Sequence, residues 1–208
     1  TRLQVEHGVT EMVTGIDIVQ EQFRLAAGAP LSPAVLAAAE RAATPHGHAI
    51  EVRLTAEDPS VDFLPTPGTL RRWVMPSGPG VRVDTGLADG DRIPSEYDNL
   101  IAKIMTHGAD RDAALDRMGR ALDEVLIAGI QTTLPFHRWV VRDPAFRVGD
   151  VSTEWVADHW DGAGQRGLVA ERAAGVAGLA VLDGVMAGAE GSIGPSRRRE
   201  IPGFSAKD

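Results

Sequence analysis

Cysteine is absent from the 208-residue sequence, which excludes disulfides, thiolate metal sites and cysteine nucleophiles. Lysine is nearly absent: of the 21 basic residues only Lys103 and Lys207 are lysines. Aromatic residues make up 5% of the chain. Long apolar runs are also missing, because the best candidate, 173–189, is rich in Ala and Gly and contains Asp183. That run is too short and too polar to predict a membrane span.

The rest of the composition is that of a globular protein, 43% apolar and 24% charged, with a net charge of −8. The acidic balance argues against a nucleic-acid partner and gives no sign of a membrane-binding patch. Without cysteine or a signal segment, we expect a cytoplasmic enzyme. The composition shifts near Asp161. We therefore expect a domain over 1–161, and over 162–208 an Ala/Gly-rich linker or tail, or the start of a further domain.

The first eleven residues carry the most information. Arg2, Gln4 and Glu6 alternate with Leu3 and Val5, which predicts a strand over 2–6 with one polar face. Helical spacing of apolar residues follows at once, so a charged strand end meets a helix start, a common place to hold an anion. The alternative is an ordinary solvent-facing strand, and the pattern alone favours it.

The remaining patterns predict an α+β fold with a mostly antiparallel sheet and flanking helices. We expect strands near 49–57, 69–75, 81–84 and 101–107, with 69–75 and 81–84 forming a hairpin. Helices near 17–27 and 110–128 should pack on the sheet, and a further helix is predicted over 34–43. The expected N-caps are Asp17, Ser32, Asp110 and, for a last short helix, Ser152.

Four segments together resemble the biotin carboxylase family, the ATP-grasp subunit or domain of acyl-CoA, acetyl-CoA and pyruvate carboxylases. Residues 1–11 read T-R-L-Q-V-E-H-G-V-T-E, similar to the family's N-T-R-x-Q-V-E-H-P-V-T-E, with Gly8 in place of the usual proline and no residue matching the asparagine. Further on, 47–59 read G-H-A-I-E-V-R-L-T-A-E-D-P, 63–68 read F-L-P-T-P-G and 97–103 read Y-D-N-L-I-A-K. The resemblance covers roughly residues 1–160 and implies the C-terminal part of such an enzyme.

The resemblance also implies roles for single residues. Arg2, with Gln4 and Val5, would hold bicarbonate, and Glu6 would take its proton as general base. Arg53 would stabilise the enolate-like form of biotin, so Arg2, Glu6 and Arg53 should share one cleft. The alternative for Arg53 is a structural ion pair with Glu51 or Glu57 on its own strand face.

Other polar residues have structural interpretations. The spacing of His7, His46 and His48 fits no compact zinc motif. Glu11 and Asp58 are expected to cap a helix and a turn. Lys103 is expected to bury its stem and to pair its ammonium group with Asp98 or leave it in solvent. By resemblance, Tyr97 and Asp98 would help to shape the biotin pocket.

The implied activity is ATP-dependent carboxylation of biotin on a carrier, as the biotin carboxylase part of an acyl-CoA carboxylase alpha subunit. The cofactors would be ATP, Mg²⁺ or Mn²⁺, and carrier-bound biotin. No Gly-rich phosphate loop occurs, so the nucleotide site and the Mg²⁺ ligands are expected upstream, with no metal site within this chain. Neither lysine is flanked by methionines, so the chain is not expected to be the biotin carrier itself.

The expected partners are a biotin carboxyl carrier domain, a carboxyltransferase subunit and a second copy of the chain, with Val81 and Arg82 at the dimer surface. Two other functions stay open. One is another ATP-grasp ligase acting on a different carboxylate, and the other is a non-catalytic fragment that only binds partner subunits.

Overall fold

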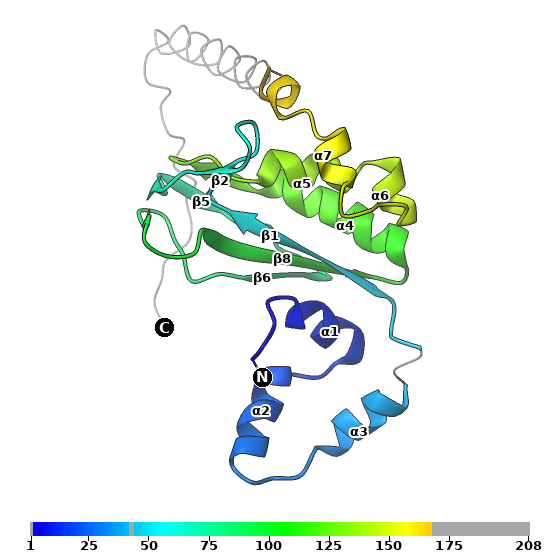
Figure 1. The fold of residues 1–208 in the computed structure, drawn as a ribbon. Helices are drawn as coiled ribbons and strands as arrows, with labels where there is room; N and C mark the ends of the chain where they lie inside the picture. Colours follow the sequence, from blue (N-terminus) through cyan, green and yellow to red (C-terminus); the bar gives the residue numbers. More distant parts are fainter. Residues whose placement is uncertain (1, 42–43, 168–208) are drawn as a thin grey trace, which may run out of the picture. The chain divides into compact units, whose positions relative to one another are not determined.

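The computed structural model describes residues 2–41 and 44–167, and residues up to Gln165 form one compact unit (Figure 1). Its helices and strands follow in this order: α1 (His7–Thr14), α2 (Ile18–Ala26), α3 (Pro33–Glu40), β1 (His48–Thr55), β2 (Glu57–Asp58), β3 (Leu64–Pro65), β4 (Gly68–Thr69), β5 (Arg72–Val74), β6 (Val81–Asp84), β7 (Arg92–Ile93), β8 (Leu100–Gly108), α4 (Arg111–Glu124), β9 (Leu126–Ala128), α5 (Leu134–Val140), α6 (Pro144–Val148) and α7 (Trp155–His159). The predicted α+β class with antiparallel strand pairing is confirmed.

The main sheet has three strands in the order β1-β8-β6, and both pairings are antiparallel. Along β1, Ile50, Val52 and Leu54 are buried on one face, where α4 covers the sheet. Glu51 and Arg53 point to the opposite face, because side chains alternate along a strand. Helix α1 covers that face, and the register places Arg53 beside Lys103 of β8. The sheet thus separates an apolar core from a charged layer under α1.

The apolar core accounts for the strongest sequence patterns. Helix α4 buries one stripe of residues at helical spacing, and β8 and β1 supply the facing residues. The fully buried large side chains of this core include Leu54, Leu70, Ile104, Leu115, Met118 and Leu122. This packing fixes β1 and β8 in place, and therefore fixes the side chains on their other face.

Three of the four predicted N-caps are confirmed, and Ser152 is wrong, because Glu154 is the N-cap residue of α7 and its side chain makes no capping bond. The side chain of Asp17 accepts a hydrogen bond from the Gln20 N–H, that of Ser32 from the Val35 N–H, and that of Asp110 from the Ala113 N–H. These caps satisfy amide groups that the first helical turn leaves without partners, which makes helix starts among the most readable features of a sequence.

The predicted strand over 2–6 is wrong. No described strand pairs with this segment, and its backbone already turns, since the His7 N–H donates to the Gln4 carbonyl at 3.3 Å. The Val5 carbonyl accepts its hydrogen bond from the ammonium group of Lys103, at 2.9 Å, instead of from a neighbouring strand. A period of two over five residues was too short to separate a strand from an extended lead into a helix.

Three further expectations about the sheet are wrong. The segments 69–75 and 81–84 do not form a hairpin, because β5 pairs with β9 and β6 pairs with β8. The helix predicted over 110–128 ends at Glu124, after which the chain enters β9. Helix α2 forms as predicted but buries none of its residues, so it does not pack on the sheet as expected.

Two expectations reach beyond the described residues. The linker or tail predicted over 162–208 lies outside them from residue 168 onward, as do residues 42–43 of the helix predicted over 34–43. In the described part of the chain, no helix has the length and hydropathy that crossing a membrane requires.

Candidate functional site

Glu6 and Arg53 meet in space although 47 positions separate them in the sequence. Glu6 is the N-cap residue of α1, and Arg53 projects from β1 toward it. The Arg53 Nη2 donates to the Glu6 Oε2 at 2.9 Å, and both side chains are about half exposed, at 52% and 49%. An ion pair this exposed contributes little to stability, typically about 0–1 kcal/mol. The pair is therefore accessible to small molecules and inexpensive to rearrange.

The backbone of Arg53 is held from the side of α5. The His137 ring bonds to the Arg53 carbonyl through its Nε2, at 2.8 Å. Burial lowers the pKa of His137 to about 4, so the ring is neutral near pH 7. Because the carbonyl can only accept, Nε2 carries the proton of the neutral ring. Helix α5 thereby fixes the backbone of Arg53 through His137.

Lys103 fixes the other half of the site. Its ammonium group donates to the Val5 carbonyl at 2.9 Å and lies 3.2 Å from the Asp84 carboxylate. The predicted pairing of Lys103 with Asp98 is wrong, because Asp98 accepts the Leu100 N–H in a local turn. The buried stem of Lys103 agrees with prediction. Its ammonium group anchors the residue just before Glu6 to the central strand.

A chain of ion pairs extends this anchorage along α1. Glu11 accepts a hydrogen bond from Arg82 at 2.6 Å and another from the Ile18 N–H at 2.8 Å, which confirms its predicted capping role. Burial alone would raise the pKa of Asp84, but hydrogen bonds from Arg82 and Lys103 outweigh it and lower that pKa. The hydrogen bonds that Arg82 donates, to Asp84 and then to Glu11, raise the pKa of Arg82.

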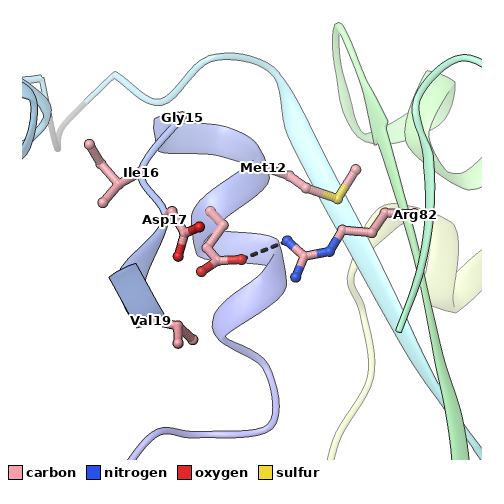
Figure 2. Close-up of a pocket in the computed structure, with 7 residues that line it drawn as sticks. Met12, Gly15, Ile16, Asp17, Val19 and Arg82 are labelled. Atoms are coloured by element: carbon pink, nitrogen blue, oxygen red, sulfur yellow. Dashed lines mark hydrogen bonds and ion pairs between the residues drawn. The ribbon is translucent and has the colours of Figure 1, made fainter. Parts of the chain in front are cut away.

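Figure 2 shows where these ion pairs reach the surface, at a hollow of about 500 Å³ between α1, the start of α2 and β6. The dashed line that ends at the Arg82 guanidinium marks its ion pair with Glu11, and both residues line the hollow. Because Arg82 is already engaged by Glu11 and Asp84, this hollow offers no free cation to a ligand.

The remaining predicted ligands lie on the lead into α1. Arg2 is exposed and its Nη1 donates to the Leu3 carbonyl at 3.2 Å. The Gln4 side chain is exposed, and the backbone carbonyl oxygen of Gln4 lies 2.7 Å from the His7 Nδ1. Among the predicted cleft residues the structure thus joins Glu6 to Arg53 directly, while Arg2 bonds within its own segment. The cleft of all three stays a prediction.

Three residues of this region were not singled out as site residues from the sequence: Glu51, Lys103 and His137. Glu51 is two positions before Arg53 on the same strand face, and the strict alternation of β1 contained that signal. The partners of Lys103 and His137 lie 98 and 84 positions away, and no local pattern predicts pairs at that separation.

Two other predicted contacts, of Glu57 and Asp58, have different outcomes in the structure. Glu57, an alternative partner for Arg53, instead accepts hydrogen bonds from Thr55 and Asn99. Asp58 caps a turn as predicted, by accepting from the N–H and hydroxyl of Ser60. Within the described ranges no group of three or more His, Asp or Glu side chains could hold a metal ion.

Tyr97 and Asp98 help to line a separate hollow of about 710 Å³ with Leu64, Pro65 and Pro94 among its walls. Tyr97 is 82% exposed. Their expected part in a biotin pocket stays a prediction.

Comparison with known proteins places this geometry in a family. The biotin carboxylase C-terminal domain model matches residues 51–158, more than half of the chain. The model of the carbamoyl-phosphate synthase L chain ATP-binding domain matches residues 1–34. Glu6 and Arg53, which touch in the structure, therefore come from two different family segments.

Curated relatives and solved structures agree with these matches. The biotin carboxylase of Pseudomonas aeruginosa is 47% identical over 156 residues, 75% of this chain and 33% of that protein. The biotin-dependent acyl-coenzyme A carboxylase alpha3 subunit of Mycobacterium leprae is 46% identical over 166 residues, 77% of this chain and 27% of that protein.

Among solved structures, the biotin carboxylase domain dimer of Hydrogenobacter thermophilus 2-oxoglutarate carboxylase, in complex with MgADP, ADP and bicarbonate, superposes with a TM-score of 0.70. It is 40% identical in sequence, and the match covers 76% of this chain and 34% of that one. The chain thus spans about a third of the length of the relatives it matches. It belongs to the biotin carboxylase family and carries that family's C-terminal portion.

Proposed function

We propose that this chain supplies the bicarbonate- and biotin-facing part of a biotin carboxylase, within an acyl-CoA carboxylase alpha subunit. The reaction is the ATP-dependent carboxylation of biotin on a carrier. The observation that carries the proposal is the contact between Glu6 and Arg53, at 2.9 Å. It joins the acid and the cation that the chemistry requires, from two segments that resemble the family independently.

Each proposed role follows from the chemistry of bicarbonate. A small anion needs guanidinium and N–H donors, which Arg2 and the backbone of Gln4 and Val5 would supply. Its remaining proton needs a base within hydrogen-bond reach, and Glu6 is the carboxylate at that place. Arg53 would stabilise the negative charge that develops on the ureido oxygen of biotin. The half-exposed setting of Glu6 and Arg53 leaves room for both substrates.

Nucleotide and metal binding are proposed to lie outside this chain. The described residues contain no cluster that could hold a metal ion, and the sequence has no Gly-rich phosphate loop. Phosphoryl transfer from ATP depends on Mg²⁺ and on donors that cradle the phosphates. The partners proposed are therefore an ATP-binding portion, a biotin carboxyl carrier domain, a carboxyltransferase subunit and, for dimerisation, a second copy.

Two alternatives remain to be tested against this proposal: another ATP-grasp ligase, and a non-catalytic fragment that only binds partner subunits. A chimera distinguishes them, in which residues 1–158 of this chain replace the matching third of the Pseudomonas aeruginosa biotin carboxylase. Biotin-dependent turnover of the chimera would support the proposal. A folded chimera without turnover would favour the non-catalytic alternative.

The role of Glu6 is tested in the same chimera. Glu6→Gln keeps the size of the side chain but removes the base, and should lower bicarbonate-dependent ATP cleavage about 10²-fold, the usual scale for a lost general base. Glu124→Gln, at the exposed end of α4, is the matched control and should leave turnover unchanged. Full turnover of the Glu6→Gln chimera would show that the base is elsewhere.

A further inference from the structure

Glu51 is a buried carboxylate without a hydrogen-bond partner. Its side chain is 6% exposed, and neither of its oxygens accepts a hydrogen bond within the described residues. Buried polar groups in native proteins are nearly always bonded, so each exception calls for an explanation. No other buried side-chain nitrogen or oxygen in the described ranges shares this state.

The groups around Glu51 are mostly cationic. Arg53 lies on the same face of β1, Lys103 on the neighbouring β8, and His7 and Glu6 at the start of α1. Burial raises the pKa of Glu51, while Lys103 and then Arg53 act in the opposite direction. The Glu51 carboxylate thus lies near two cations, Lys103 and Arg53, but is hydrogen-bonded to neither.

Arg53 stands between two carboxylates. Its Nη2 is bonded to the Glu6 Oε2 at 2.9 Å, while its Nε lies 3.9 Å from the Glu51 Oε1. The second distance exceeds a hydrogen bond by about 1 Å. A rotation of the guanidinium that carries Nη2 away from Glu6 and Nε toward Glu51 would exchange one carboxylate partner for the other. His137 holds the Arg53 carbonyl, so the side chain can move while the strand stays in place.

This geometry bears on the proposed chemistry. A general base acts best when its carboxylate is not paired with a cation, and one Glu6 oxygen, Oε2, is bonded to Arg53. We propose that Glu51 is a positioning residue that accepts the Arg53 guanidinium in a second arrangement, and so releases Glu6 to act as base. Moving Arg53 from one carboxylate to the other makes and breaks no covalent bond. The inference rests on the proposed function only in giving Glu6 the role of general base.

Stability arguments separate this role from a structural one. A buried carboxylate without hydrogen bonds destabilises the folded protein, and its replacement by a neutral group of the same shape is neutral or stabilising. A carboxylate whose charge stabilises the fold behaves in the opposite way. Glu51→Gln is nearly the same shape, so its effect on unfolding shows which kind of residue Glu51 is.

The experiment follows the Nε–H group of Arg53 by nitrogen-15 NMR in the full 208-residue chain, with the signal assigned through Arg53→Lys. In Glu6→Gln the competing charge is lost, so Arg53 should turn to Glu51. Its Nε–H should then exchange with water about tenfold more slowly, as a charge-assisted hydrogen bond requires. The double variant Glu6→Gln with Glu51→Gln should lose that slowing. Glu124→Gln serves as the matched control.

The thermal midpoint supplies the second readout. Glu51→Gln alone should unfold within about 3 °C of the parent or above it, since about 1 kcal/mol moves the midpoint of a domain this size by a few degrees. Unchanged exchange at Arg53 in Glu6→Gln would overturn the proposal, as would slowing that survives in the double variant. A midpoint that falls by more than about 5 °C in Glu51→Gln would also overturn it, because the Glu51 charge would then stabilise the fold through Lys103 and Arg53. None of these readouts uses carboxylation, so failure of the proposed function would be seen separately, in the chimera.

Discussion

Among single residues, His137 gives the site a testable dependence on pH. Its folded pKa is about 4, against 6.5 for the free side chain, so between these values the unfolded chain binds more protons than the folded one. The free energy of unfolding should therefore fall as pH drops from about 6.5 to 4, by at most about 3 kcal/mol from this group. Part of the ring reaches solvent, which reduces the effect.

His137→Gln checks this prediction, because the amide can still donate to the Arg53 carbonyl but does not titrate. Urea unfolding of parent and variant from pH 4 to 7 should show a shallower loss of stability in the variant. Parallel curves over that range would mean that the ring is not held neutral by the fold.

Gly8 carries a second residue-scale prediction. It is buried in α1, and a Cβ there would collide with the Met105 thioether, with Glu51 also in contact. Alanine gains about 1 kcal/mol of helix propensity over glycine, while overpacking a core costs about 1–3 kcal/mol. Gly8→Ala should therefore lower the free energy of unfolding by about 1 kcal/mol.

The control for Gly8 is Gly119→Ala in α4, where the nearest atom to an added Cβ is Arg142 Nη2 at 3.8 Å. That change should raise stability by about 0.5–1 kcal/mol. In a double-mutant cycle, Met105→Ala should remove most of the cost of Gly8→Ala. Additive effects of the two changes would show that Met105 is not the obstacle.

For helices and strands, the sequence predicted the features that are decided by residues close to one another in the chain. The β1 strand was predictable, because alternation over eight residues records its two faces. The helix caps were predictable for the same reason, since a cap needs only its own first turn. The pairing of β6 with β8 instead of with β5 was not, because strand partners are chosen by distant packing.

The same limit applied to the candidate site. The resemblance in two segments led to Glu6 and Arg53, and the contact between them is present. Local pattern could not predict that Lys103 would bond Val5, since the apolar residues around Lys103 predicted only a buried stem. Nor could it predict that residues 2–6 would stay unpaired. Predictions failed where a side chain took the place of a backbone partner.

The attachment of α1 to the sheet gives an element-scale prediction. Arg82 of β6 bonds Glu11 in the middle of α1, and no other described basic side chain pairs with that carboxylate. Arg82→Met should make the α1 amides exchange with deuterium about tenfold faster, since hydrogen bonds to charged groups contribute about 1.5–3 kcal/mol. Exchange in α4 should not change.

Arg120→Met is the control for Arg82, because its pair with Glu124 is an exposed contact along one helix turn. Such pairs contribute about 0.3–0.5 kcal/mol, too little to alter exchange in α1. If the α1 amides exchange equally slowly in the parent and in Arg82→Met, the hydrogen bond from Lys103 to Val5 alone would attach α1 to the sheet.

At the scale of the whole molecule, two surfaces of the isolated chain lack partners. Helices α2 and α3 and the loop between them expose four large apolar side chains: Phe23 at 74%, Leu36 at 52%, Leu31 at 46% and Leu25 at 44%. The eight-residue strand β1 also forms one edge of its sheet among the described strands. Apolar patches and long strand edges are both surfaces on which proteins associate.

We therefore predict that residues 1–208 alone self-associate, bind ATP very weakly and do not carboxylate biotin. Sedimentation velocity across a concentration series should show growing assemblies, and Phe23→Ser with Leu36→Ser should reduce them because it removes the two most exposed apolar groups of the α2–α3 surface. Exposed Val148, at 78% on α6, offers the control, since Val148→Ser leaves the α2–α3 surface intact. Calorimetry with MgATP and a carboxylation assay with free biotin and bicarbonate complete the test. Turnover by the chain alone would mean that its own residues hold the nucleotide, and would contradict the proposal that ATP binds outside it.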